Sequence, residues 1–114
     1  MNGNDKRKHI RVESTNLLNF VCMSEDGEPY QQGMGRTLNV SEAGILLETY
    51  KPIDVQTRIS ITIGIEEELV DIEGEIIFLK ESDKDIYEAG IKFSQINDTE
   101  RMILLKFIEA FKNK

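Results

Sequence analysis

The sequence contains a single cysteine, Cys22, and a single histidine, His9. One cysteine excludes an internal disulfide framework and a zinc site built from several cysteines, and one histidine excludes a metal centre made of several histidines. No apolar run approaches the roughly 18 to 20 residues that span a bilayer. The opening segment MNGNDKRKH is too polar for a secretory signal. We therefore expect a cytoplasmic domain with no membrane insertion, metal or cofactor.

Basic residues are scarce outside the N-terminus. Residues 1–12 contain four basic residues and one acidic residue, a net charge of +3, whereas the remaining residues contain 10 basic and 20 acidic residues, a net charge of −10. This balance argues against a binder of nucleic-acid polymers, which must neutralise many phosphates. The basic segment is either a solvated tail or an anion-binding arm for a small, compact anion. We expect a flexible arm over residues 1–12 and one domain over residues 13–114.

Apolar and polar residues alternate with period two through most of the chain, which is typical of strands with one buried face. The predicted strands are residues 16–23, 36–40, 44–49, 57–64, 69–80 and 86–93. Residues 24–35 contain three glycines and Pro29, which predicts a loop or a loose hairpin connection. Six short strands with alternating faces suggest a small antiparallel barrel or sandwich.

The longest predicted strand, residues 69–80, has one apolar face. Its members, all expected to lie on that face, are Val70, Ile72, Gly74, Ile76 and Phe78. A glycine inside such a run also indicates a bend, as strongly curved sheets require.

The last segment changes to a helical period. Asn97 followed by Glu100 fits a capping box, in which the asparagine caps the helix and the glutamate reaches back. An apolar stripe follows, made of Ile103, Leu104, Phe107, Ile108 and Phe111. We expect a helix over about residues 97–112 that covers an open end of the sheet.

The basic arm carries one candidate binding group, Arg7 and Arg11, four positions apart just before the first strand. Guanidinium groups bind phosphates in a forked geometry, stack on bases and pair with the edge of guanine. Two of them on one arm could hold a ligand that has both phosphate and purine. Any basic tail supplies such a spacing by chance, so the pair alone is a weak signal.

The segment from Asn39 to Gly44 carries the second candidate group. Asn39 and Ser41 lie two positions apart, so they would point the same way in extended chain and offer short hydrogen-bonding groups. Gly44 could turn at positive φ and would let a ligand approach the backbone. The same residues are also common in ordinary hairpin turns.

Together the two groups form the pattern RxxxR followed by (D/N)xSxxG, filled by Arg7, Arg11, Asn39, Ser41 and Gly44. This joint pattern resembles the PilZ domain family. The segment YEAGIKF at residues 87–93 is similar to the family's final strand, and a closing helix is expected after it. The resemblance extends from about residue 6 to about residue 112.

The resemblance implies a fold of the mainly β class, a six-stranded antiparallel β-barrel with a C-terminal α-helix. It also implies a stand-alone bacterial receptor for cyclic di-GMP that couples this messenger to an unknown protein partner through ordering of its arm. Arg7 and Arg11 would hold guanines and phosphates, while Asn39 and Ser41 would bind from the barrel surface and Gly44 would keep the turn close.

Two positions bear on how the ligand would bind. Position 39 is Asn where many members have Asp, and the family pattern admits both. Lys6 occupies a position that the family links to binding of one ligand or a stacked pair, so Lys6 is a further candidate ligand residue and the stoichiometry stays open. The output stays open as well among motility, exopolysaccharide, adhesion and transcription.

Three other readings are weaker. Catalysis is disfavoured because Cys22 falls in an apolar strand run and His9 lies among cations, with no triad, phosphate loop or metal cage. A groove for single-stranded nucleic acid needs exposed aromatics along a basic track, whereas we expect most aromatics here in the core. A PilZ-like interaction module that binds no nucleotide is the main alternative.

Overall fold

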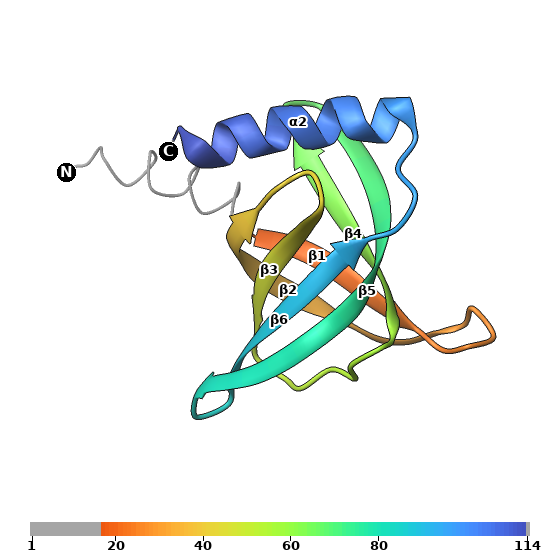
Figure 1. The fold of residues 1–114 in the computed structure, drawn as a ribbon, viewed down its shortest axis with the longest axis vertical. Coiled ribbons are helices and arrows are strands. Elements are labelled where there is room, and N and C mark those ends of the chain that lie inside the picture. The colour runs from red at the N-terminus through yellow and green to blue at the C-terminus, as the bar shows by residue number, and fades with distance from the viewer. Residues whose placement is uncertain (1–16, 114) are drawn as a thin grey trace.

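The computed structural model describes residues 17–113, which form a six-stranded barrel and one helix (Figure 1). The elements are β1 (Leu17–Met23), β2 (Pro29–Val40), β3 (Gly44–Thr49), β4 (Arg58–Ile65), β5 (Glu68–Asp83), β6 (Ile86–Phe93) and α2 (Asp98–Lys112). Every neighbouring pair is antiparallel, and the barrel closes in the order β1-β2-β3-β6-β5-β4 through pairing of β4 with β1. The predicted fold class is therefore confirmed. The predicted arm over residues 1–12 lies outside the described residues.

The barrel interior holds the core because one face of each strand is apolar at every second position. Strand β4 is the clearest case, since Ile59, Ile61 and Ile63 are all fully buried. Cys22 is also fully buried in this core, as the apolar run around it predicts. Burial, together with the charge of Asp54, raises the pKa of the Cys22 thiol to about 11.

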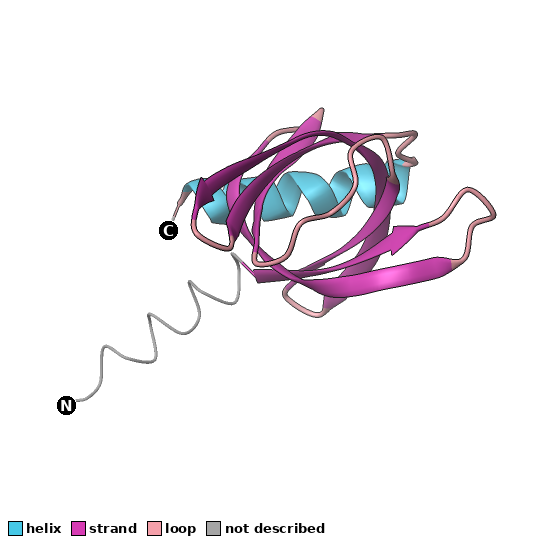
Figure 2. Ribbon diagram, turned by 90° about the horizontal axis from the view of Figure 1, so that it is seen from below, coloured by secondary structure: helices cyan, strands magenta, loops and turns pink. Residues whose placement is uncertain are grey.

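Helix α2 lies across one end of the barrel, as Figure 1 shows from the side and Figure 2 along the barrel. The Asn97 side chain accepts a hydrogen bond from the Glu100 backbone N–H at 2.8 Å, and the Glu100 carboxylate accepts one from the Asn97 N–H at 3.1 Å. The predicted capping box is thus confirmed. The predicted stripe closes the barrel end, with Ile103, Leu104, Phe107 and Ile108 buried and Phe111 partly buried. No helix among the described residues is long and apolar enough to cross a membrane.

The hairpin connection predicted over residues 24–35 does join the antiparallel pair β1 and β2, but its second half is wrong, because β2 already begins at Pro29. Gly33 and Gly35 lie inside this strand. A Cβ at Gly35 would stand 2.6 Å from Leu47 Cγ, and one at Gly33 would stand 3.2 Å from the Phe20 ring. These glycines therefore allow close packing inside a strand and do not mark a turn.

The predicted core face of β5 is right up to Ile76 and wrong at Phe78. Ile76 pairs with Ile91, but Phe78 pairs with Gly90, so Ile77 is an extra residue in a β-bulge. The bulge reverses the alternation, and the Phe78 side chain is 45 % exposed on the outside of the barrel. The bulge lies three residues after Gly74, the residue at which we expected a bend.

Candidate functional site

The turn between β2 and β3 is held from several sides. The Ser41 N–H donates to the Gly44 carbonyl at 2.9 Å, and the Ser41 hydroxyl oxygen accepts from the Ala43 N–H at 3.2 Å. The Ala43 carbonyl in turn accepts from the Phe93 N–H of β6. An ion pair of 2.9 Å between Glu42 and Arg101 connects the turn to α2. A turn with these contacts is preorganised for a ligand, which lowers the entropic cost of binding.

Asn39 and Ser41 both present hydrogen-bonding groups to the outside of the barrel, and both are exposed. Asn39 Oδ1 accepts from the Val40 N–H at 2.9 Å, which leaves the two donors of the Asn39 amide without a partner among residues 17–113. The Ser41 hydroxyl accepts within the turn and keeps its own proton for donation. These two side chains can therefore donate to an anion or to the acceptors of a base.

Gly44 differs from its expected conformation. It does not adopt a positive φ, which among the described glycines is found only at Gly27. Instead, a Cβ at position 44 would overlap with the backbone carbonyl oxygen of Ile91 on β6. Gly44 is thus required for the close approach of β3 to β6, which places the turn beside the groove described next.

An open groove of about 360 Å³ runs along the outer surface of β2, β3, β6 and β5. Its polar end contains Asn39, Ser41 and Gly44, the three barrel residues predicted as a site. Its other end is apolar. The residues that complete its lining are Val40, Ala43, Ile45, Leu46, Ile77, Phe78, Gly90, Ile91 and Lys92.

The strand register explains why these residues lie together. Asn39 pairs with Leu46, Leu46 pairs with Gly90, and Gly90 pairs with Phe78, so four strands contribute one residue each to a single row. We call these four residues the groove row. Neighbouring strands lie about 4.8 Å apart, so the row is roughly 14 Å long.

The charge of the groove differs from that of the rest of the domain. No carboxylate lines it, although residues 13–114 carry a net charge of −10. Its one charged residue is Lys92, which makes no ion pair with any residue the structure describes. An anion would therefore meet attraction here and repulsion over much of the remaining surface.

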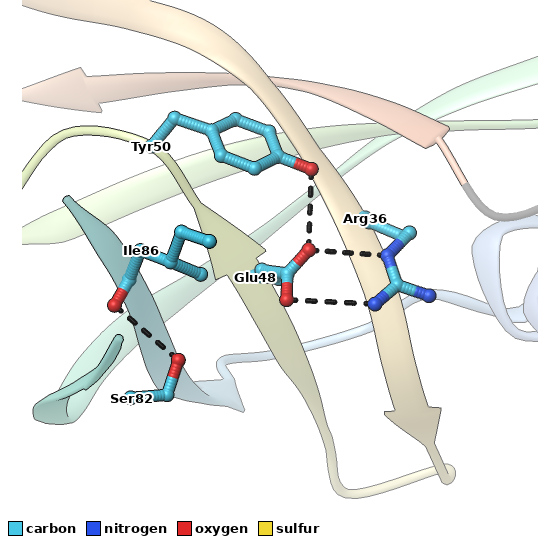
Figure 3. A network of polar contacts seen from close by, with 5 residues as sticks. All are labelled: Arg36, Glu48, Tyr50, Ser82 and Ile86. Atoms are coloured by element: carbon cyan, nitrogen blue, oxygen red, sulfur yellow. Dashed lines mark hydrogen bonds and ion pairs between the residues drawn. The ribbon is translucent and has the colours of Figure 1, made fainter. Parts of the chain in front are cut away.

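Arg36, another cation on the outer surface of β2, is already paired. Figure 3 shows its guanidinium forked onto the Glu48 carboxylate, at 3.1 and 3.4 Å, while the Tyr50 hydroxyl donates to the same carboxylate at 3.2 Å. The hydrogen bond and the charge of Glu48 raise the pKa of Arg36. Among the cations discussed here, Lys92 is the one that remains available to the groove.

The structure brings together part of the predicted site. Arg7, Arg11 and the candidate Lys6 lie outside the described residues. The prediction missed Lys92 and assigned Phe78 to the core, although Gly90, a glycine within a predicted strand, was a signal that something packs closely against that strand. The expectation that most aromatics lie in the core is right for Phe20, Phe93, Phe107 and the partly buried Phe111. It is wrong for Tyr30, Tyr50 and Phe78, which are about half exposed.

The family model of the PilZ domain matches residues 5–110. The chain belongs to the PilZ domain family. PilZ domains are typically receptor or adaptor domains without catalytic activity. Among residues 17–113 no group of three or more histidine, cysteine or acidic side chains is arranged to hold a metal ion.

Solved structures support the PilZ fold. The PilZ domain of CeSA from a cellulose-synthesizing bacterium has a TM-score of 0.62 at 13% identity, with 84% of this chain and 93% of that chain covered. The Bacillus subtilis inhibitor of motility MotI/DgrA has a TM-score of 0.61 at 19% identity, with 86% and 48% covered. MrkH of K. pneumonia in its apo state has a TM-score of 0.55 at 17% identity, with 87% and 50% covered.

The chain thus spans about half the length of MotI and of MrkH. A search of the curated proteins gave no match. At these identities the likeness to the solved structures concerns the fold.

Proposed function

We propose that this PilZ domain is a cytoplasmic receptor for cyclic di-GMP that passes the signal to a protein partner. The observation that carries the proposal is the groove, in which Asn39, Ser41 and Gly44 lie together with Lys92 and without a carboxylate. Cyclic di-GMP is a compact dianion with two guanines, so it suits a small groove that carries no negative charge on an otherwise acidic domain.

The start of the described chain supports a role for the two arginines. Leu17, the first residue of β1, pairs with Arg36, which precedes Asn39 by three residues on β2. Extended chain spans at most about 3.5 Å per residue, so the chain from Leu17 back to Arg11 can span up to about 20 Å and the chain back to Arg7 up to about 35 Å. Both guanidinium groups can therefore reach a ligand in the groove.

The proposed mechanism divides the ligand between two parts of the chain. Asn39 and Ser41 donate hydrogen bonds from the preorganised turn, while Arg7 and Arg11 bind phosphate and guanine from the arm. The ligand then holds the arm against the barrel, and this arrangement is what a partner recognises. A ligand can shift the arm only through contacts that it makes in one state and not in the other.

Calorimetric titration with cyclic di-GMP tests the proposal, with Arg7→Ala and Arg11→Ala as the test variants. Each substitution should weaken binding by about 1 to 3 kcal/mol, because each removes a bidentate contact. Lys8→Ala is the matched control, since it removes the same charge from the same arm outside the motif. Cyclic di-AMP controls for recognition of guanine, and the wild-type stoichiometry, compared with that of Lys6→Ala, distinguishes one bound ligand from two.

Saturable binding that is weakened in both arginine variants and unchanged in Lys8→Ala would support the receptor. If wild type gives no heat and no competition at high ligand concentration, the receptor proposal fails, and the alternative of an interaction module without nucleotide takes its place. Equal losses of affinity in Arg7→Ala, Arg11→Ala and Lys8→Ala would point to charge alone and would contradict the assignment of the arginines.

A further inference from the structure

Phe78 is a large apolar residue that the backbone turns out of the core. The alternation through Ile72, Gly74 and Ile76 would bring position 78 inward, and the extra residue Ile77 reverses it. The result is an aromatic side chain that is 45 % exposed. Bulges are common beside binding sites because they re-aim a side chain at the cost of regular pairing.

The opposite end of the groove row also lies beside a β-bulge. On β2, Thr37 pairs with Leu47 and Asn39 pairs with Leu46, so Leu38 is the extra residue of a second bulge. Thr37 is buried, and without this bulge Asn39 would also point inward. The two end residues of one cross-strand row, Asn39 and Phe78, therefore both face outward because of a bulge next to them.

The Phe78 ring is fixed in position by Gly90. A Cβ at Gly90 would overlap with three atoms of the ring, so the ring lies directly over the glycine on β6. Leu46 continues the row beyond Gly90. The apolar end of the groove thus offers a preorganised aromatic ring with no hydrogen-bonding group of its own.

We infer that Phe78 is the residue on which one purine base of the bound cyclic dinucleotide stacks, and that it helps to select such a ligand. This inference rests on the proposed function. Nucleic-acid bases stack face to face on aromatic side chains. The row of roughly 14 Å lets the ligand hydrogen-bond at Asn39 while one base reaches Phe78. Lys92, beside the row, faces the charged part of the ligand.

Substitution of Phe78 tests the inference by titration with cyclic di-GMP. Phe78→Ala and Phe78→Leu should weaken binding by about 5- to 100-fold, whereas Phe78→Tyr should retain it, because stacking needs the ring. Tyr50→Ala is the matched control, since Tyr50 is an equally exposed aromatic residue that does not line the groove. Thermal melts of each variant show whether the fold is intact, as the exposure of Phe78 leads us to expect.

A fluorescence measurement reports stacking directly. The chain contains no tryptophan, so Phe78→Trp and Tyr50→Trp each create a protein with a single one. Cyclic di-GMP should quench the emission of Phe78→Trp, because a stacked guanine contacts the indole, and should leave Tyr50→Trp unchanged.

The outcomes separate the inference from the proposed function. If wild type binds cyclic di-GMP but Phe78→Ala binds equally well and Phe78→Trp is not quenched, the inference fails and the receptor stands. If wild type does not bind, the receptor fails first. If Phe78→Ala instead dissociates a dimer on size-exclusion chromatography with unchanged ligand affinity, the ring belongs to a protein contact and the inference is wrong.

Discussion

The α-carbon of Gly44 lies so close to the carbonyl oxygen of Ile91 that no side chain fits between them. Gly44 pairs with Lys92, and the Phe93 N–H that donates to the Ala43 carbonyl follows directly. The last residue of the (D/N)xSxxG motif is therefore part of the barrel framework. Its neighbours Asn39 and Ser41 are the residues of that motif with free hydrogen-bonding groups.

Gly44→Ala should lower the free energy of unfolding by about 1 to 3 kcal/mol, because the added methyl group forces β3 away from β6. Urea denaturation measures this loss. Ser41→Ala is the control, since Ser41 is exposed, and it should weaken cyclic di-GMP binding with little change in stability. A Gly44→Ala protein as stable as wild type would show that the two strands separate without cost and would contradict this role.

Thr37→Val should stabilise the protein by about 1 kcal/mol. The Thr37 hydroxyl is buried without a hydrogen-bond partner among the described residues, so its replacement by a methyl group removes a desolvation cost. Thr49→Val is a matched control, because Thr49 is equally buried and its hydroxyl donates to the Lys51 carbonyl at 3.0 Å. That substitution should destabilise by a similar amount. If urea denaturation gives both variants the same sign, the hydroxyl of Thr37 has a partner.

The Cys22 thiol should resist alkylation in the folded protein. Burial raises its pKa to about 11 from an ordinary value of 9.0, so the reactive thiolate is scarce and inaccessible at pH 8. Iodoacetamide should modify the urea-unfolded chain much faster than the native one, as mass spectrometry measures. Equal rates would contradict the burial of Cys22.

The same shift predicts a dependence of stability on pH. The folded pKa is the higher one, so the neutral thiol contributes its full stability below about pH 9, and this contribution is lost as the pH rises toward 11. Cys22→Ala removes the group, so its stability should fall less between these two pH values than that of wild type. Parallel curves for the two proteins would be incompatible with the shift.

Period-two alternation predicted the barrel well because each strand has one face in a closed core. Ile59, Ile61 and Ile63 were assignable from sequence for this reason, and the change to a helical period gave α2 together with its capping box. The loop assigned to residues 24–35 failed because Gly33 and Gly35 serve packing inside β2. A glycine that makes room for Leu47 has the same sequence signature as one in a turn.

The site was half predictable. The spacing of Asn39, Ser41 and Gly44 predicted that these residues lie together at one end of the groove, because a local motif places residues of one turn close to one another. The outward orientation of Phe78 could not be predicted in this way, because the bulge at Ile77 depends on how β5 pairs with β6 and not on the local sequence pattern. One extra residue is enough to move a side chain from the core to the groove on the outer surface.

Each of the six strands between Leu17 and Phe93 is paired on both sides. This pairing does not run along their full length, because β2 pairs with β3 only from Arg36 on and β5 pairs with β4 only up to Glu75. Residues 29–35 of β2 and 77–83 of β5 therefore each have one free edge, to which a partner's strand could be added. Elsewhere on the barrel, a protein that binds this domain has to recognise side chains on the outer surface or on α2. Closure of the rest of the barrel confines the risk of edge-to-edge aggregation to these two segments, although three of the eight aromatic residues, Tyr30, Tyr50 and Phe78, are exposed.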